Sequence, residues 1–231
     1  MCSSGLRPSL APYESYPIHQ LLGKVTKLNG DRTAVVDGDR SFTYSTLHNL
    51  SSRFASVLVD LGAKKGDRVG ILAPNCVEFV IAFYGITDSG CVVTTINSGY
   101  REREIAHQVS DSGCDLMVVH ESLEQVLNAA FEITGRKVKT IVITSEPDHP
   151  GSFWNLLDKS PPFQGVSIDP DKDLAALPYS SGTTGLSKGV MLTHYNLVSN
   201  IEQLISLSGA SKMVRDDIVL VHLPLFHIYG M

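Results

Sequence analysis

The sequence predicts an α/β fold in which mostly parallel strands are covered by helices. Between residues 33 and 143, short runs rich in valine and isoleucine alternate with segments of helical periodicity. Such alternation is typical of βαβ units, whose strands run parallel. The strand segments are apolar throughout, which indicates a sheet buried on both faces. With 231 residues, the chain is long enough to bury a sizeable core.

The first elements are local ones. We expect a short amphipathic helix over 18–25, because apolar residues recur there at helical spacing. The apolar segments 33–36 and 41–44 flank an Asp-Gly turn and predict a β-hairpin. A helix over 47–61 follows, and Gly62 stands where a left-handed glycine closes a helix.

The alternating region comes next, and its middle helix is apolar on almost every side, which predicts deep burial. Strands are expected at 68–72, 91–96, 116–119 and 138–143. Helices are expected at 76–88, 105–109 and 123–131.

The last third of the chain breaks this pattern. Five prolines between 145 and 172 predict a long surface connection. After a glycine-rich loop comes an apolar run over 189–192, and then residues 197–205 predict a helix with Thr193 as its N-cap. An apolar stretch follows at 218–231.

The composition excludes several function classes. A formal net charge of −5 leaves no basic surface to favour nucleic acid or an anionic membrane as the main partner. No stretch is apolar for long enough to span a bilayer. The four cysteines show neither C-x-x-C nor zinc-site spacing, so we expect reduced thiols and assign no metal ligands. These observations predict a soluble, intracellular protein.

One loop is not explained by packing. Residues 179–189, YSSGTTGLSKG, combine three glycines and five serine or threonine hydroxyls with a single charge, Lys188. Glycines let backbone N–H groups converge on an anion, and hydroxyl and ammonium groups add donors, which together suit a polyphosphate. A Walker P-loop is excluded because Ser187 and Gly189 occupy the positions of its second glycine and its magnesium-binding hydroxyl. A flexible Ser/Gly linker is the other interpretation.

Three segments resemble a known family. Residues 177–197, LPYSSGTTGLSKGVMLTHYNL, resemble the AMP-binding signature of the adenylate-forming superfamily, in detail that of 4-coumarate–CoA ligases, beetle luciferases and related acyl-CoA synthetases. Residues 66–79 resemble its early strand–turn–helix, and 223–230, LPLFHIYG, its next motif. The family usually has proline where this chain has Ser187, and that departure should loosen the loop.

The resemblance implies ATP-dependent activation of a carboxylic acid to acyl-AMP and then to acyl-CoA, with ATP, Mg²⁺ and coenzyme A as cofactors. By position, the phosphates would be held by Ser180, Ser181, Gly182, Thr183, Thr184, Gly185 and Lys188. Lys188 and Thr184 would be catalytic, and His227 and Tyr229 would line the acyl side of the pocket. Without the resemblance, His227 would belong to a buried strand as a hydrogen-bonded core histidine.

The family's chains are much longer, so the resemblance implies a particular domain organisation. Residues 1–15 form an extended lead-in, and 16–231 form an incomplete N-terminal AMP-binding domain that lacks the later N-terminal subdomain and the C-terminal domain. Activity of this chain alone would then be incomplete. The location would be cytoplasmic or peroxisomal, and neither the carboxylate nor the oligomeric state is set by the sequence.

The sequence is also compatible with two other function classes. One is a non-catalytic protein derived from such a ligase that binds a nucleotide or a partner. The other is a phosphotransferase, which the failed Walker match disfavours. Carboxylate-dependent exchange of pyrophosphate into ATP separates the ligase from both.

Overall fold

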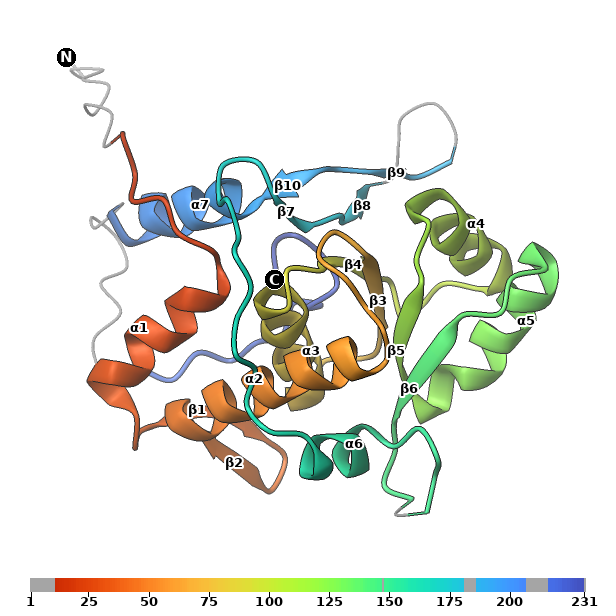
Figure 1. The fold of residues 1–231 in the computed structure, drawn as a ribbon, viewed down its shortest axis with the longest axis horizontal. Helices are drawn as coiled ribbons and strands as arrows, with labels where there is room; N and C mark the ends of the chain where they lie inside the picture. The colour runs from red at the N-terminus through yellow and green to blue at the C-terminus, as the bar shows by residue number, and fades with distance from the viewer. Residues whose placement is uncertain (1–10, 147, 181–185, 207–215, 231) are drawn as a thin grey trace.

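The fold is built on one six-stranded sheet. The computed structural model describes residues 11–146, 148–180, 186–206 and 216–230. The strands of this sheet are β3 (Arg68–Leu72), β4 (Val92–Ile96), β5 (Leu116–His120), β6 (Lys139–Ile143), β7 (Leu174–Ala176) and β10 (Leu192–Thr193). Their order is β10-β7-β4-β3-β5-β6, and only β10 runs antiparallel to its neighbour (Figure 1). The α/β prediction with a mostly parallel sheet is confirmed.

Helices cover both faces of the sheet. They are α1 (His19–Asn29), α2 (Tyr44–Asp60), α3 (Val77–Asp88), α4 (Glu102–Ser112), α5 (Glu124–Thr134), α6 (Phe153–Lys159) and α7 (His194–Ser206). The first three, with α6, lie over one face, and α4 and α5 lie over the other (Figure 1). Because neighbouring strand residues point to opposite faces, Val93 packs in the first core and Ile96 in the second.

Most of the predicted elements are confirmed. Strands β1 (Thr33–Asp37) and β2 (Arg40–Thr43) pair as the expected antiparallel hairpin. Gly62 follows α2 with φ +93°, the left-handed conformation that lets a glycine end a helix. The Thr193 hydroxyl accepts the Asn196 N–H at 3.2 Å and so caps α7.

The prediction for 145–172 is wrong in part, because α6 forms inside the proline-rich segment. Phe153 and Leu157, one helical turn apart, are both fully buried. The Phe153 ring stacks on Phe54 of α2 with 4.9 Å between centroids. Tertiary burial of one apolar face therefore stabilises a helix only seven residues long.

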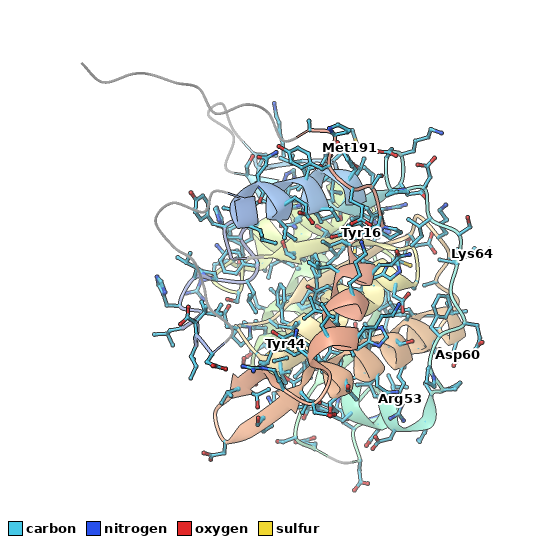
Figure 2. All side chains as sticks on the ribbon, turned by 90° about the vertical axis from the view of Figure 1, so that its left-hand side faces the viewer. Tyr16, Tyr44, Arg53, Asp60, Lys64 and Met191 are labelled. Atoms are coloured by element: carbon cyan, nitrogen blue, oxygen red, sulfur yellow. The ribbon has the colours of Figure 1, made fainter. Side chains whose placement is uncertain are left out.

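The apolar run 189–192 is divided between two short strands. Its first residue belongs to β9 (Lys188–Gly189) and its last to β10. Between them Val190 and Met191 are exposed, and Figure 2 shows Met191 on the outside of the molecule. No backbone ladder therefore runs through the middle of this apolar run.

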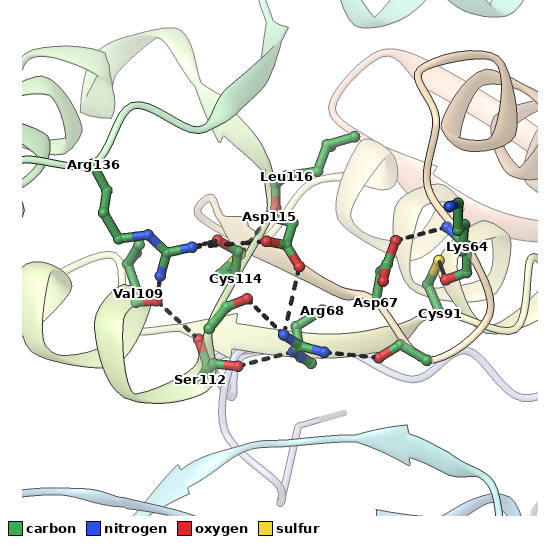
Figure 3. Close-up of polar contacts among 12 residues, drawn as sticks. Lys64, Asp67, Arg68, Cys91, Val109, Ser112, Cys114, Asp115, Leu116 and Arg136 are labelled. Carbon is green, nitrogen blue, oxygen red and sulfur yellow. Dashed lines mark hydrogen bonds and ion pairs between the residues drawn. The ribbon is translucent and has the colours of Figure 1, made fainter.

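The C-terminal end of α4 is held by two arginines at the amino-terminal edge of the sheet (Figure 3). Arg68 donates to the carbonyls of Ser112 and Gly113, each at 3.0 Å. Arg136 donates to the carbonyl of Val109, in the last turn of α4, at 3.4 Å and to that of Cys114 at 3.2 Å. Because the last carbonyls of a helix lack partners within it and carry partial negative charge, both guanidinium groups stabilise this end of α4.

The cysteines that the structure describes form no disulfide bonds. They are Cys76, Cys91 and Cys114. Burial raises the pKa of the Cys114 thiol to about 12, so it stays protonated. Among the described residues, no helix has the length and apolar character needed to cross a membrane.

Candidate functional site: a strand ribbon that carries the glycine-rich loop

A two-stranded ribbon carries the glycine-rich loop. Strand β8 (Tyr179–Ser180) pairs antiparallel with β9, so that Ser180 lies opposite Lys188 and Tyr179 opposite Gly189. Beyond the ribbon the Val190 N–H donates to the Pro178 carbonyl at 2.8 Å. The ribbon thus holds the two arms of the loop side by side.

Ser180 and Lys188 are the predicted site residues that the structure brings together. Directly opposite residues of an antiparallel pair project to the same face, with Cβ atoms about 5 Å apart. Both side chains are exposed. One hydroxyl donor and one ammonium group therefore stand together where the loop begins and ends.

The rest of the predicted phosphate-binding set is not placed. Ser181, Gly182, Thr183, Thr184 and Gly185 lie outside the described residues. Their roles stay predictions from the sequence.

The ribbon leaves the sheet at the carboxyl end of β7. The Leu177 N–H donates to the Val93 carbonyl at 2.8 Å, which extends the parallel pairing between β4 and β7. The Thr94 hydroxyl in turn donates to the Leu177 carbonyl at 2.9 Å. Ligands of open α/β sheets bind beyond the carboxyl ends of the strands, and the ribbon stands at that edge.

Gly189 is closely packed in the ribbon. A Cβ atom at this position would lie 3.1 Å from side-chain atoms of both Leu177 and Tyr179. A side chain at position 189 would therefore require the Leu177 and Tyr179 side chains to shift by a few tenths of an ångström. This contact explains a glycine directly after the loop lysine without any appeal to the ligand.

Helix α4 contacts both arms of the ribbon. The Tyr179 hydroxyl donates to the Asp111 carboxylate at 2.6 Å. The other arm contributes the Ser187 carbonyl, which accepts a hydrogen bond from His107 Nε2 at 2.8 Å. Burial, reinforced by the hydrogen bond to Asp111 and its charge, raises the pKa of Tyr179, so its hydroxyl stays a donor.

A third residue of α4, Gln108, contacts strand β4. Gln108 is only 1% exposed, and its amide donates to the Thr94 hydroxyl at 2.9 Å and to the Thr95 carbonyl at 3.0 Å. Since Thr94 itself donates to Leu177, Gln108 connects α4 through β4 to the base of the ribbon.

The segment 216–230, which carries His227 and Tyr229, is attached to the same edge of the sheet but to its other face. The Thr95 hydroxyl donates to the Phe226 carbonyl at 2.6 Å. Asn75, just beyond β3, donates to the Leu223 carbonyl at 2.9 Å and accepts from the Leu225 N–H at 2.8 Å. Residues far apart in sequence are thus held by neighbouring strand ends.

His227 and Tyr229 themselves are exposed. The Tyr229 side chain points to solvent with 84% exposure, and its N–H donates to His227 Nδ1 at 3.3 Å. No strand forms among the described residues 216–230, so the alternative prediction of a buried strand with a core histidine is wrong. Among the described contacts, none joins His227 or Tyr229 to Lys188.

The described donors fit an anion better than a cation. Lys188 is exposed and forms no ion pair with another described residue, so its charge is free to meet a phosphate. No group of three His, Cys, Asp or Glu side chains within the described ranges could hold a metal ion. The arrangement can therefore neutralise part of the charge of a polyphosphate.

Sequence reasoning missed the residues that support the loop. His107, Gln108 and Asp111 sit on α4, and the periodicity of its buried residues, such as Ile105 and Val109, gives them no role. Polar residues on an amphipathic helix normally face solvent, and no local spacing indicates which of them reach a loop some 70 residues later. Only the tertiary fold reveals these contacts.

Known proteins share both the sequence and the fold. The model of the AMP-binding enzyme family matches residues 24–231. The 4-coumarate–CoA ligase of Pinus taeda is 35% identical over 229 residues, which cover 97% of this chain and 42% of the relative. The 4-coumarate–CoA ligase 2 of Solanum tuberosum is 36% identical over 220 residues, covering 93% and 40%. The chain thus spans about two fifths of the length of these relatives.

Solved structures give the same result. A long-chain-fatty-acid–CoA ligase from Archaeoglobus fulgidus superposes with a TM-score of 0.85 at 29% identity, over 96% of this chain and 45% of that one. ATP-bound MatB from Rhodopseudomonas palustris gives a TM-score of 0.79 at 28% identity, over 94% and 42%. Family model, relatives and fold agree, and the chain belongs to the AMP-binding enzyme family, the adenylate-forming superfamily that includes the 4-coumarate–CoA ligases.

Proposed function

We propose that this chain supplies the ATP phosphate-binding part of an acid–CoA ligase, which converts a carboxylic acid to acyl-AMP and then to acyl-CoA. The observation that carries the proposal is the cross-strand pair of Ser180 and Lys188 at the mouth of the loop. Under this proposal residues 16–231 belong to the N-terminal AMP-binding domain of such an enzyme.

In the proposed reaction the chain binds and neutralises phosphate. The Lys188 ammonium group would contact the β- and γ-phosphates and offset the charge on departing pyrophosphate. The Ser180 hydroxyl would donate to the same oxygens, together with Ser181, Thr183 and Thr184 and the backbone at Gly182 and Gly185. Mg²⁺ supplies charge neutralisation when it arrives with ATP, and coenzyme A supplies the thiol of the second half-reaction.

The segment 216–230 would form the acyl side of the site. His227 and Tyr229 would face the acyl group or the acyl-adenylate, and the attachment of their segment to Thr95 supports a position near the carboxyl ends of the strands. The named relatives act on aromatic and fatty acids, so both classes are candidates. Unpaired thiols agree with an intracellular location, cytoplasmic or peroxisomal.

Two measurements test the function in order. Titration calorimetry with ATP and Mg²⁺ should show binding to the purified chain, and absence of any ATP or AMP binding would contradict the proposal. Carboxylate-dependent exchange of pyrophosphate into ATP should then appear in the full-length protein with either a cinnamate-type or a fatty acid. Binding of ATP without any exchange would favour the alternative, a non-catalytic nucleotide- or partner-binding protein.

A further inference from the structure

Two side chains of α4 contact opposite arms of the loop ribbon. His107 meets the Ser187 carbonyl at 2.8 Å, and Asp111 meets the Tyr179 hydroxyl at 2.6 Å. Four residues apart on a helix, they project from one face, one turn above the other. The imidazole of His107 also packs edge-on against the Tyr179 ring, with 6.4 Å between centroids.

The chemistry of each contact fixes which group donates. A carbonyl oxygen only accepts, so His107 Nε2 must carry a hydrogen in the contact with Ser187. Asp111 accepts from Tyr179, whose raised pKa keeps the phenol protonated. Both contacts are therefore directional, and each sets the position of one arm.

Helix α4 is much better supported than the ribbon. Its residues Ile105 and Val109 are fully buried. The Arg101 N–H donates to the Glu104 carboxylate at 2.7 Å and so caps its first turn. The ribbon consists of two residue pairs. A two-stranded ribbon of this size is marginal in water by itself, so its geometry depends on what it packs against.

We propose that His107 and Asp111 are positioning residues that hold the two arms of the loop at a fixed spacing, an arrangement we name the α4 clamp. The proposal rests on the function proposed above for the loop. With both arms held, Ser180 and Lys188 face the same side before the nucleotide arrives. Less order must then be created on binding, which raises affinity without a direct contact to the ligand.

Hydrogen–deuterium exchange of the chain without nucleotide tests the clamp directly. The reporter is the peptide over 186–192, which contains the Val190 amide bonded to Pro178. We expect Asp111→Ala, Tyr179→Phe and His107→Ala each to raise its exchange rate about tenfold or more. The double variant of Asp111→Ala and Tyr179→Phe should exchange no faster than the faster single one, because the two residues form a single contact.

Conservative variants and a matched control separate positioning from general stability. Asp111→Asn keeps an acceptor and His107→Gln keeps a donor, so both should restore much of the protection. Arg103→Ala, an exposed change on the same helix, should leave exchange unchanged. Rates in Asp111→Ala and His107→Ala within twofold of the unmodified chain would overturn the clamp.

Affinity for ATP with Mg²⁺ is the second readout. The clamp variants should weaken binding about three- to tenfold while Arg103→Ala binds normally. Faster exchange with unchanged affinity would show that the contacts are structural and would overturn the positioning role. If the unmodified chain binds no nucleotide, the proposed function fails, and the exchange result alone decides whether α4 holds the ribbon.

Discussion

Arg40 of the β-hairpin donates from both terminal guanidinium nitrogens to the carboxylate of Glu78, in the first turn of α3. The Glu78 side chain is 3% exposed, whereas that of Arg40 is 46% exposed. Trp154 Nε1 of α6 donates to the same carboxylate at 3.0 Å. Hydrogen bonding to Glu78 raises the pKa of Arg40, and a buried charge joins three elements that are distant in sequence.

Arg40→Met should destabilise the fold, because it leaves the buried Glu78 carboxylate with only the neutral donors Trp154 and Cys76. Removal of one partner of a buried pair costs about 3–5 kcal/mol, and the exposure of Arg40 reduces our expectation to about 1–3 kcal/mol. Urea denaturation measures it. Arg103→Met is the control, and an equal loss there would show that the effect is not specific to Glu78.

Lys188→Ala should weaken ATP binding at least about tenfold, because the loop loses its only charge. In the full-length protein, adenylation should fall about ten- to a thousandfold. Lys188→Arg should restore only part of the loss, since a planar guanidinium does not replace a compact ammonium. Lys137→Ala removes an exposed lysine elsewhere and should bind ATP normally. Unchanged affinity in Lys188→Ala would refute the assigned role.

Ser187→Pro should tighten nucleotide binding about two- to fivefold. Proline reduces the freedom of the unbound loop, an effect of about 0.4–1 kcal/mol where the backbone is compatible. It also keeps the carbonyl that His107 contacts. Calorimetry with ATP gives the affinity, and a clear weakening would mean that Ser187 adopts a conformation closed to proline.

Gly85→Ala should destabilise the α2–α3 interface. A Cβ at this position would lie 2.6 Å from the Ser51 carbonyl and 2.9 Å from Phe54 Cβ. Because the Ser51 carbonyl belongs to the backbone of α2, it cannot shift without distorting that helix. We therefore expect the free energy of unfolding to fall by about 1–3 kcal/mol, despite the better helix propensity of alanine. Gly23→Ala is the matched helical control, because its Cβ meets only the His48 ring, at 3.3 Å. Thermal denaturation should give a lower melting temperature for Gly85→Ala than for Gly23→Ala. Equal melting temperatures would contradict the packing argument.

His194 should make the fold sensitive to acid. It is 1% exposed, and Nδ1 accepts the Ile18 N–H at 3.1 Å. Burial lowers its pKa from 6.5 to about 4, with His19 nearby adding to the shift and Asp173 opposing it. The folded state then binds a proton less readily than the unfolded one, so this stability is present above pH 6.5 and is lost as pH falls towards 4.

The size of the acid effect follows from the same values. Between pH 7.5 and 5.0 one such histidine costs about 2 kcal/mol of unfolding free energy. Urea melts at the two pH values should show a smaller difference in His194→Asn, which keeps an acceptor for Ile18 but does not titrate. Part of the acid sensitivity will remain, because burial also lowers the pKa of His19 to about 4. An identical pH dependence in the variant would rule out His194 as a source.

The sequence predicts those parts of the fold that have a long, regular period. The helix over 47–61 is confirmed because burial of one face repeats along several turns, and the strand over 68–72 is confirmed because it is a continuous apolar run buried on both faces. Helix α6 is missed because seven residues among prolines show too little periodicity, and its stability comes from Phe153 against Phe54. The local sequence pattern therefore does not predict an element whose stability depends on contacts with a distant part of the chain.

The same limit applies to the site. Glycine and lysine in one loop indicate phosphate chemistry, because that chemistry depends on residue types close together in sequence. The partners of the loop, Thr94, His107 and Asp111, are threonine, histidine and aspartate at ordinary positions of a strand and a helix. Their relevance arises only when β7 pairs with β4.

The strand order implies a vulnerable interval during synthesis. Strands β3 to β6 can pair with one another as they appear, but the outer edge of β4 waits for β7, which follows only after residues 144–173. At 5–20 residues per second that wait is roughly 1.5–6 seconds. An open edge with every residue of β4 buried in the final fold invites pairing with other nascent chains. Ribosome-bound chains arrested near residue 150 should therefore recruit chaperones more strongly than chains arrested after the ribbon has emerged.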